Sequence, residues 1–176
     1  MGLDPARPTG IMLFGGHGSN VMQQIVAALQ NCPCELQFIA ICGRNEKLAD
    51  SLRAMQSRFP LHVVGFTTEV PRYMWLSDFF IGKPGPGSIS EAIQMKLPVL
   101  IERNSWTLPQ ERYNADWVLE KQVGIVLKSF RDIADAVSDL LSRAKFESYR
   151  AHVAAIHNRA VFEITDILDS ILEKTA

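Results

Sequence analysis

The chain has 176 residues, of which 47% are hydrophobic, with a formal net charge of −1 and a mean hydropathy of +0.04. This length is enough for one domain with a full core, and the charge gives no support for nucleic-acid binding through a basic surface. No apolar run reaches about 18 residues, and the amino terminus has no apolar signal-peptide core. We therefore expect a cytoplasmic chain, or one that reaches a membrane peripherally through a partner domain.

Three cysteines, Cys32, Cys34 and Cys42, are expected to be reduced thiols. Their odd number and the Cys-x-Cys spacing argue against a disulfide framework. No histidine or cysteine pair stands nearby to complete a zinc site, which would need about four ligands.

In chain order, residues 1–9 are polar, contain two prolines and are interpreted as a linker remnant, so the predicted domain spans residues 10–176. Short apolar runs bounded by glycine and polar residues predict strands at residues 10–14, 36–42, 61–66, 78–81, 97–101 and 123–127. Helical spacing of apolar residues predicts intervening helices, among them residues 21–30, 70–76, 110–121 and 129–143, and then two segments ending near Lys174.

Strands of about five residues that alternate with helices predict an α/β fold with a parallel sheet. The near-continuous apolar character of the strands indicates that helices cover both faces, as in a Rossmann-like three-layer sandwich. Ligands of such sheets bind at the carboxyl ends of the strands, where glycine-rich turns follow the first and the fourth predicted strands.

The stretch from Gly82 to Ala92, GKPGPGSISEA, is the centre of the predicted site. Its small residues let backbone N–H groups approach an anion, and the helix that follows adds its positive end. Ser88 is predicted to cap this helix, and Glu91, three residues on, would complete a capping box. Alternatively, Glu91 faces the hydroxyl groups of a bound sugar while the turn holds phosphates, as in half of a nucleotide-diphosphate site.

The first glycine-rich loop contains Gly16, His17, Gly18 and Ser19. It fits a dinucleotide fingerprint poorly, because the place of the third glycine holds Val21 and the second strand is followed by Gly43 and Arg44 rather than an acid. Arg44 would suit a 2′-phosphate, so an NADP-dependent reductase stays as an alternative. His17 is either a hydrogen-bond donor to a phosphate or a loop residue in contact with solvent.

Two further turns fall at the same predicted sheet edge. Phe66 and Thr67 follow the third strand and could lie beside a base. Gln110, Glu111 and Asn114 open the helix after the fifth strand, where their amide and carboxylate groups either hold sugar hydroxyls or cap the helix.

Five segments in this order resemble the C-terminal domain of family-28 glycosyltransferases, and most closely the monogalactosyldiacylglycerol synthases. The segments are GGHGS, CGRN, GF, GKPGPGSISEA and LPQERYN, and the resemblance extends from about Leu3 to the last helix. A more distant resemblance is to the bacterial N-acetylglucosaminyltransferase of peptidoglycan lipid II synthesis. The resemblance implies the C-terminal half of a GT-B enzyme, which binds the UDP-sugar donor.

The resemblance also implies roles for individual residues. Glu91 would hold the ribose hydroxyls, Phe66 and Thr67 would border the uracil, and Gln110 and Glu111 would face the donor sugar. The residues expected beside the diphosphate are Gly16, His17, Gly18, Ser19, Gly87 and Ser88. We include Arg44, Val70, Gly85 and Asn114 among the candidate donor-binding residues.

The family's N-terminal acceptor domain, which carries the general base and the lipid-acceptor surface, has no counterpart in this sequence. The expected activity is therefore that of a hexosyltransferase domain, acting with galactose and a lipid acceptor such as diacylglycerol, and inactive by itself. It would require no metal or other cofactor, because helix ends and loop amides carry the diphosphate charge. The alternative is a non-catalytic nucleotide-sugar-binding subunit that pairs with a separate acceptor subunit or self-associates through its apolar C-terminal helix.

Overall fold

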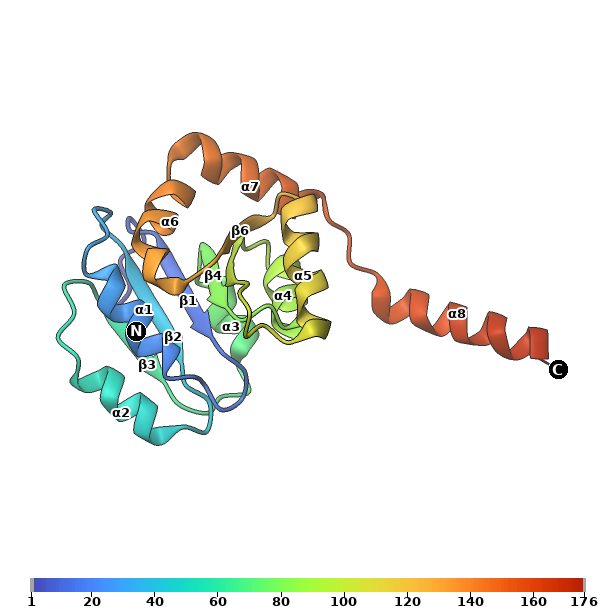
Figure 1. Cartoon of the computed structure of the whole chain (residues 1–176), viewed down its shortest axis with the longest axis horizontal. Helices are drawn as coiled ribbons and strands as arrows, with labels where there is room; N and C mark the ends of the chain where they lie inside the picture. The colour runs from blue at the N-terminus through green and yellow to red at the C-terminus, as the bar shows by residue number, and fades with distance from the viewer. Residues whose placement is uncertain (1, 176) are drawn as a thin grey trace.

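The computed structural model describes residues 2–175, and Figure 1 shows their arrangement. Within this range a parallel sheet of six strands has the order β3-β2-β1-β4-β5-β6. The strands are β1 (Thr9–Leu13), β2 (Gln37–Ile41), β3 (Leu61–Val64), β4 (Phe79–Gly82), β5 (Val99–Glu102) and β6 (Gly124–Leu127). The predicted α/β fold with a Rossmann-like parallel sheet is confirmed.

Helices cover both faces of this sheet and form the outer layers of a three-layer sandwich (Figure 1). One layer contains α1 (Val21–Leu29), α2 (Glu46–Ala54), the 3-10 helix η1 (Phe130–Asp132) and α6 (Ile133–Leu140). The other contains α3 (Val70–Trp75), α4 (Pro86–Gln94), α5 (Pro109–Glu120) and part of α7 (Arg143–Ala155). The last helix, α8 (Ala160–Thr175), extends away from the body (Figure 1).

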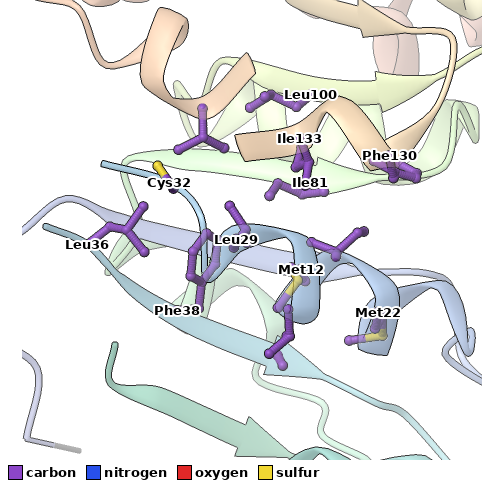
Figure 2. Packing of buried hydrophobic residues seen from close by; sticks show 14 of the residues in the cluster. Met12, Met22, Leu29, Cys32, Leu36, Phe38, Ile81, Leu100, Phe130 and Ile133 are labelled. Atoms are coloured by element: carbon purple, nitrogen blue, oxygen red, sulfur yellow. The ribbon is translucent and has the colours of Figure 1, made fainter. Parts of the chain in front are cut away.

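Successive strand residues point to opposite layers, which gives two hydrophobic cores. In β4, for example, Phe79 packs with the α1 layer and Phe80 with the α4 layer, and both side chains are fully buried. Figure 2 shows the α1 layer, where Leu29 of α1 lies beside Phe38 of β2 and Met22 lies at the other end of α1. Burial on both faces explains why the strands read as continuous apolar runs.

The strand order reverses at the seam between β1 and β4, which pair in register from Gly10–Phe79 to Leu13–Gly82. From β1 the chain builds outward to β3 on one side, and from β4 it builds outward to β6 on the other. A switch of this kind leaves a crevice at the carboxyl ends of the two central strands. The loops that end β1 and β4 therefore meet at one position of the sheet edge.

The segment before β1 lies against the domain. The side chain of Gln37 accepts a hydrogen bond from Asp4 N, at 2.9 Å, and donates to Asp4 O, Arg7 O and Thr9 Oγ1. Leu3 packs against the core of the α4 layer. The interpretation of residues 1–9 as a linker remnant stays a prediction.

Two residues other than glycine have positive φ, Lys96 at 63° and Gln122 at 52°, and both contact α7. Lys96 Nζ donates to the carbonyl oxygens of Ala154 and Ile156 at the end of the helix. The carbonyl oxygen of Gln122 lies 3.0 Å from Nδ1 of His152. These contacts hold α7 at the amino-end edge of the sheet, opposite the β1–β4 crevice.

Several predicted boundaries differ from the structure. The single helix predicted for residues 129–143 is wrong, because the side chain of Ser129 accepts a hydrogen bond from Arg131 N and starts the short η1 before α6. The predicted third strand continues to residue 66, but β3 ends at Val64. Among the helices of residues 2–175, none combines the length and the apolar character of a membrane-spanning segment.

Candidate functional site

A cavity of about 290 Å³ lies at the carboxyl ends of β1 and β2, beside the seam between β1 and β4, and we call it the seam cavity. Its floor is formed by residues from the strand ends, and its walls come from the loops after β1, β2 and β3 and from the start of α4. The lining residues are Leu13, Gly15, Gly16, Ile41, Gly43, Phe66, Thr67, Val70, Gly87, Ser88 and Glu91. The structure therefore brings together residues from four turns that are far apart in the sequence.

The amino end of α4 forms one wall of the seam cavity. Pro86 occupies the first turn, Gly85 is the N-cap residue, and the first N–H that bonds back to the cap is that of Ile89, at 3.2 Å from Gly85 O. The N–H groups of Gly87 and Ser88 belong to the first turn of the helix and so have no acceptor within it. Both residues line the cavity, so this wall can bind an anion through N–H groups and the helix dipole.

The predicted cap at Ser88 is wrong, and with it the capping box. Proline is pre-organised for the first helical position, and Pro86 starts the helix two residues before Ser88. Ser88 Oγ instead donates to Gly85 O at 3.4 Å. Glu91 lies in the second turn with an exposed side chain, outside capping geometry and lining the seam cavity.

The turn after β1 forms the opposite wall. Gly15 has a φ of 75°, and Gly18 N donates to Gly15 O at 3.2 Å, so the turn closes on itself. Gly43, after β2, packs so closely that a Cβ there would lie only 2.2 Å from Gly16 O, and Arg44 N donates to the same oxygen. The loops after β1 and β2 are thus held together by backbone contact that only glycine at residue 43 permits.

An aromatic residue and a cation lie at the β3 side of the seam cavity. The guanidinium carbon of Arg44 is 4.9 Å from the centre of the Phe66 ring, and the ring is 58% exposed. A cation over an aromatic face is attracted by the ring quadrupole. This contact gives Arg44 a partner within the protein and leaves Phe66 available at the cavity wall.

A second cavity of about 540 Å³, the loop cavity, lies beside the first, on the β5 side of the β1 turn. It is lined by Phe14, Gly18, Ser19, Val21, Lys83, Pro84, Glu102, Asn104, Trp106, Thr107, Leu108, Glu111 and Phe130. Glu102 accepts a hydrogen bond from Phe130 N at 2.9 Å, which ties the end of β5 to η1. The side chain of Trp106 is 90% exposed at this cavity.

Two contacts tie α5 to the turn after β4. Lys83 Nζ lies 3.2 Å from Glu111 Oε1, and Asn114 Nδ2 donates to Pro84 O at 2.8 Å. Two of the three polar residues at the start of α5 are thus engaged by the turn that leads into α4. Gln110 is exposed.

The predicted residues therefore divide into those that line the seam cavity, those that line the loop cavity and those that line neither. Those in the seam cavity are Gly16, Phe66, Thr67, Val70, Gly87, Ser88 and Glu91. Those in the loop cavity are Gly18, Ser19 and Glu111, whereas His17, Arg44 and Gln110 are exposed beside the cavities, Gly85 caps α4, and Asn114 faces the turn. Their contacts with a ligand stay predictions.

Sequence reasoning missed Gly43 and Lys83. A glycine directly after a strand is a signal for close backbone approach, and it could have identified Gly43. No local signal points to Lys83, whose partner is 28 positions away. Among the residues that the structure describes, no group of three histidine, cysteine, aspartate or glutamate side chains could hold a metal ion.

Comparison with known proteins agrees with this geometry. Residues 10–167 match the glycosyltransferase family 28 C-terminal domain. The chain belongs to this family. This match confirms the resemblance found in the sequence. Membership of the family also favours a glycosyltransferase over the NADP-dependent reductase.

Among curated proteins, the family-28 chain is 33% identical over 184 residues to the chloroplastic monogalactosyldiacylglycerol synthase of Spinacia oleracea. That alignment covers 99% of this chain and 35% of the relative. It is 31% identical over 173 residues to monogalactosyldiacylglycerol synthase 3 of Arabidopsis thaliana, with 92% of this chain and 37% of the relative covered. The chain thus spans about a third of the length of these relatives.

Among solved structures, MurG of Acinetobacter baumannii matches with a TM-score of 0.78 at 11% identity, covering 96% of this chain and 51% of that one. Phytolacca americana UGT2, complexed with UDP-2-fluoro-glucose and pterostilbene, matches with a TM-score of 0.60 at 16% identity, over 96% and 42% of the two chains. These similarities show the fold, that of one half of GT-B glycosyltransferases.

Proposed function

We propose that this family-28 chain is the UDP-sugar-binding domain of a hexosyltransferase that moves a hexose, galactose, from UDP to the hydroxyl group of a lipid such as diacylglycerol. The observation that carries this proposal is the seam cavity, which combines the amino end of α4, a glycine turn, an aromatic wall and the carboxylate of Glu91. The choice of galactose and diacylglycerol rests on relatives named as monogalactosyldiacylglycerol synthases.

Each part of UDP has a matching part of the cavity. The diphosphate would lie against the N–H groups of Gly87 and Ser88, where the helix dipole favours negative charge. The exposed carboxylate of Glu91 would accept hydrogen bonds from the ribose hydroxyls. Phe66 and Thr67 would border the uracil at the β3 side.

The same wall would assist the reaction. When the bond between the hexose and the β-phosphate breaks, negative charge develops on the departing UDP. Preorganised N–H groups and a helix amino end stabilise such charge most where it develops. We propose that this stabilisation replaces a bound metal ion.

Catalysis would be completed by an acceptor domain, which supplies the general base and the lipid surface and mediates any peripheral contact with a membrane. The chain alone would bind UDP but transfer the hexose slowly or not at all. A second candidate function is a binding subunit that pairs with a separate acceptor subunit. The apolar residues exposed on α8 favour such pairing, because they leave a surface for another chain.

Calorimetric titration of the chain with UDP tests the proposal. Binding of UDP, with weaker binding of ADP and no fluorescence change on addition of NADPH, is the expected result. Absence of heat at millimolar UDP would contradict it. Addition of a separately produced acceptor domain then distinguishes the two candidates. Hexose transfer is expected if the chain is the donor half of the enzyme, whereas association without transfer is expected if the chain is a non-catalytic binding subunit.

A further inference from the structure

We propose that Lys83 is a positioning residue, which fixes the carboxylate of Glu111 toward the hexose of the bound UDP-sugar and thereby sets hexose selectivity. This inference rests on the proposed function. It concerns the loop cavity, where the Lys83 and Glu111 side chains meet across the gap between the β4 turn and α5.

The two partners of this ion pair differ in exposure. The side chain of Glu111 is 12% exposed, whereas that of Lys83 is 49% exposed. Oε1 of Glu111 lies 3.2 Å from Lys83 Nζ, and no donor in the described part of the chain contacts Oε2. Lys83 thus engages one oxygen of a largely enclosed carboxylate, and the second oxygen is left for a ligand.

The pair also lies next to the expected diphosphate position. A Cβ added to Gly85, the N-cap residue of α4, would lie 3.4 Å from Lys83 Cε and 3.7 Å from Glu111 Oε1. A hexose attached to a β-phosphate at the amino end of α4 would extend past Gly85 into the loop cavity. Its hydroxyl groups would then come within reach of Glu111.

Orientation is the contribution expected of this cation. A free glutamate side chain samples several rotamers, and fixing one of them places the acceptor oxygen where one arrangement of hydroxyl groups fits best. A charged hydrogen bond is also roughly twice as strong as a neutral one. Because a half-exposed ion pair adds little to stability, replacing Lys83 should leave the fold intact.

The test measures the dissociation constants of UDP, UDP-galactose, UDP-glucose and UDP-N-acetylglucosamine for the full chain by calorimetry. Selectivity is the ratio of the weakest to the tightest constant among the three UDP-sugars. The variants are Lys83→Met, which keeps the length without the charge, Lys83→Arg, which keeps the charge, Glu111→Gln and the double variant Lys83→Met/Glu111→Gln.

We expect Lys83→Met to reduce selectivity at least about fivefold, while the dissociation constant of UDP changes less than about twofold. Lys83→Arg should retain most of the selectivity. In the Glu111→Gln background, Lys83→Met should have no further effect, because the group that it positions is altered already.

Three outcomes would overturn the inference alone while UDP binding persists. The first is unchanged selectivity in Lys83→Met. The second is an equal loss of affinity of Lys83→Met for UDP and all three UDP-sugars, which would place Lys83 on the diphosphate. The third is an unmodified chain that binds the three UDP-sugars equally. If the unmodified chain binds neither UDP nor any UDP-sugar, the proposed function fails and this inference fails with it.

Discussion

The side-chain amide of Asn114 donates a 2.8 Å hydrogen bond to the carbonyl oxygen of Pro84, which joins α5 to the turn between β4 and α4. This carbonyl belongs to a segment with two prolines and three glycines, where few other backbone bonds hold the conformation. Asn114 therefore supports the turn that presents the amino end of α4 to the seam cavity.

Asn114→Ala is expected to lower the free energy of unfolding by about 1 kcal/mol, because a part-buried hydrogen bond is lost. It should also weaken UDP binding, since the turn after β4 loses its hydrogen bond to α5. Urea denaturation and calorimetry measure the two effects. Gln110→Ala, at an exposed position in the same helix, is the matched control and should change stability by less than about 0.5 kcal/mol. Equal effects of the two substitutions would contradict this role of Asn114.

Glu91→Ala is expected to weaken UDP binding by about 1.5–3 kcal/mol, because a charged hydrogen-bond acceptor for the ribose is removed. The melting temperature should stay nearly constant, since Glu91 forms no capping box. The dissociation constant of 2′-deoxy-UDP should change less than that of UDP. Glu173→Ala, which removes an exposed carboxylate on α8, should alter neither quantity. A large fall in the melting temperature of Glu91→Ala would contradict this prediction and show that Glu91 stabilises the fold.

Removal of divalent cations should leave UDP binding unchanged. The diphosphate charge is expected to be balanced by the N–H groups of Gly87 and Ser88 and by the dipole of α4. Calorimetric titrations with excess EDTA and with millimolar magnesium should give dissociation constants within about twofold of each other. A tenfold loss of affinity in EDTA would show that a cation takes part.

Self-association of the chain should depend on the apolar side of α8. The exposed fractions of its large apolar side chains, among them Ile164 and Leu168, lie between 52 and 67%. Sedimentation velocity should detect concentration-dependent association of the chain and its loss in Ile164→Asn/Leu168→Asn. Asp169→Asn, on the same helix, serves as the control. A monomer at all concentrations would rule out this prediction.

Cys42 should be unreactive in the folded chain, because its side chain is fully buried and burial raises the pKa of the thiol from 9.0 to about 11. Alkylation at pH 8, located by mass spectrometry, should modify the half-buried Cys34 first. A thiol with a raised pKa in the folded state stabilises that state below pH 9 and loses this contribution as the pH rises to 11. The free energy of unfolding should fall across this range, by less in Cys42→Ala.

The parallel sheet could be predicted because the four inner strands, β1, β2, β4 and β5, are almost wholly buried and each strand ends at a glycine or polar turn. The start of α4 was misplaced because Ser88 and Glu91 have the spacing of a capping box, and this local pattern conceals the stronger preference of Pro86 for the first helical position. The Lys83–Glu111 pair depends on how two loops meet in space, and no periodicity within either segment encodes that.

The seam between β1 and β4 joins two stretches of chain that are separated by the whole of α1, β2, α2, β3 and α3. A nucleotide bound at this seam would contact both stretches at once and stabilise their association. A chain cut at the exposed Thr68 would accordingly give two fragments whose reassembly is favoured by a nucleotide that binds only the assembled domain, and the domain could serve as a split reporter of nucleotide-sugar concentration.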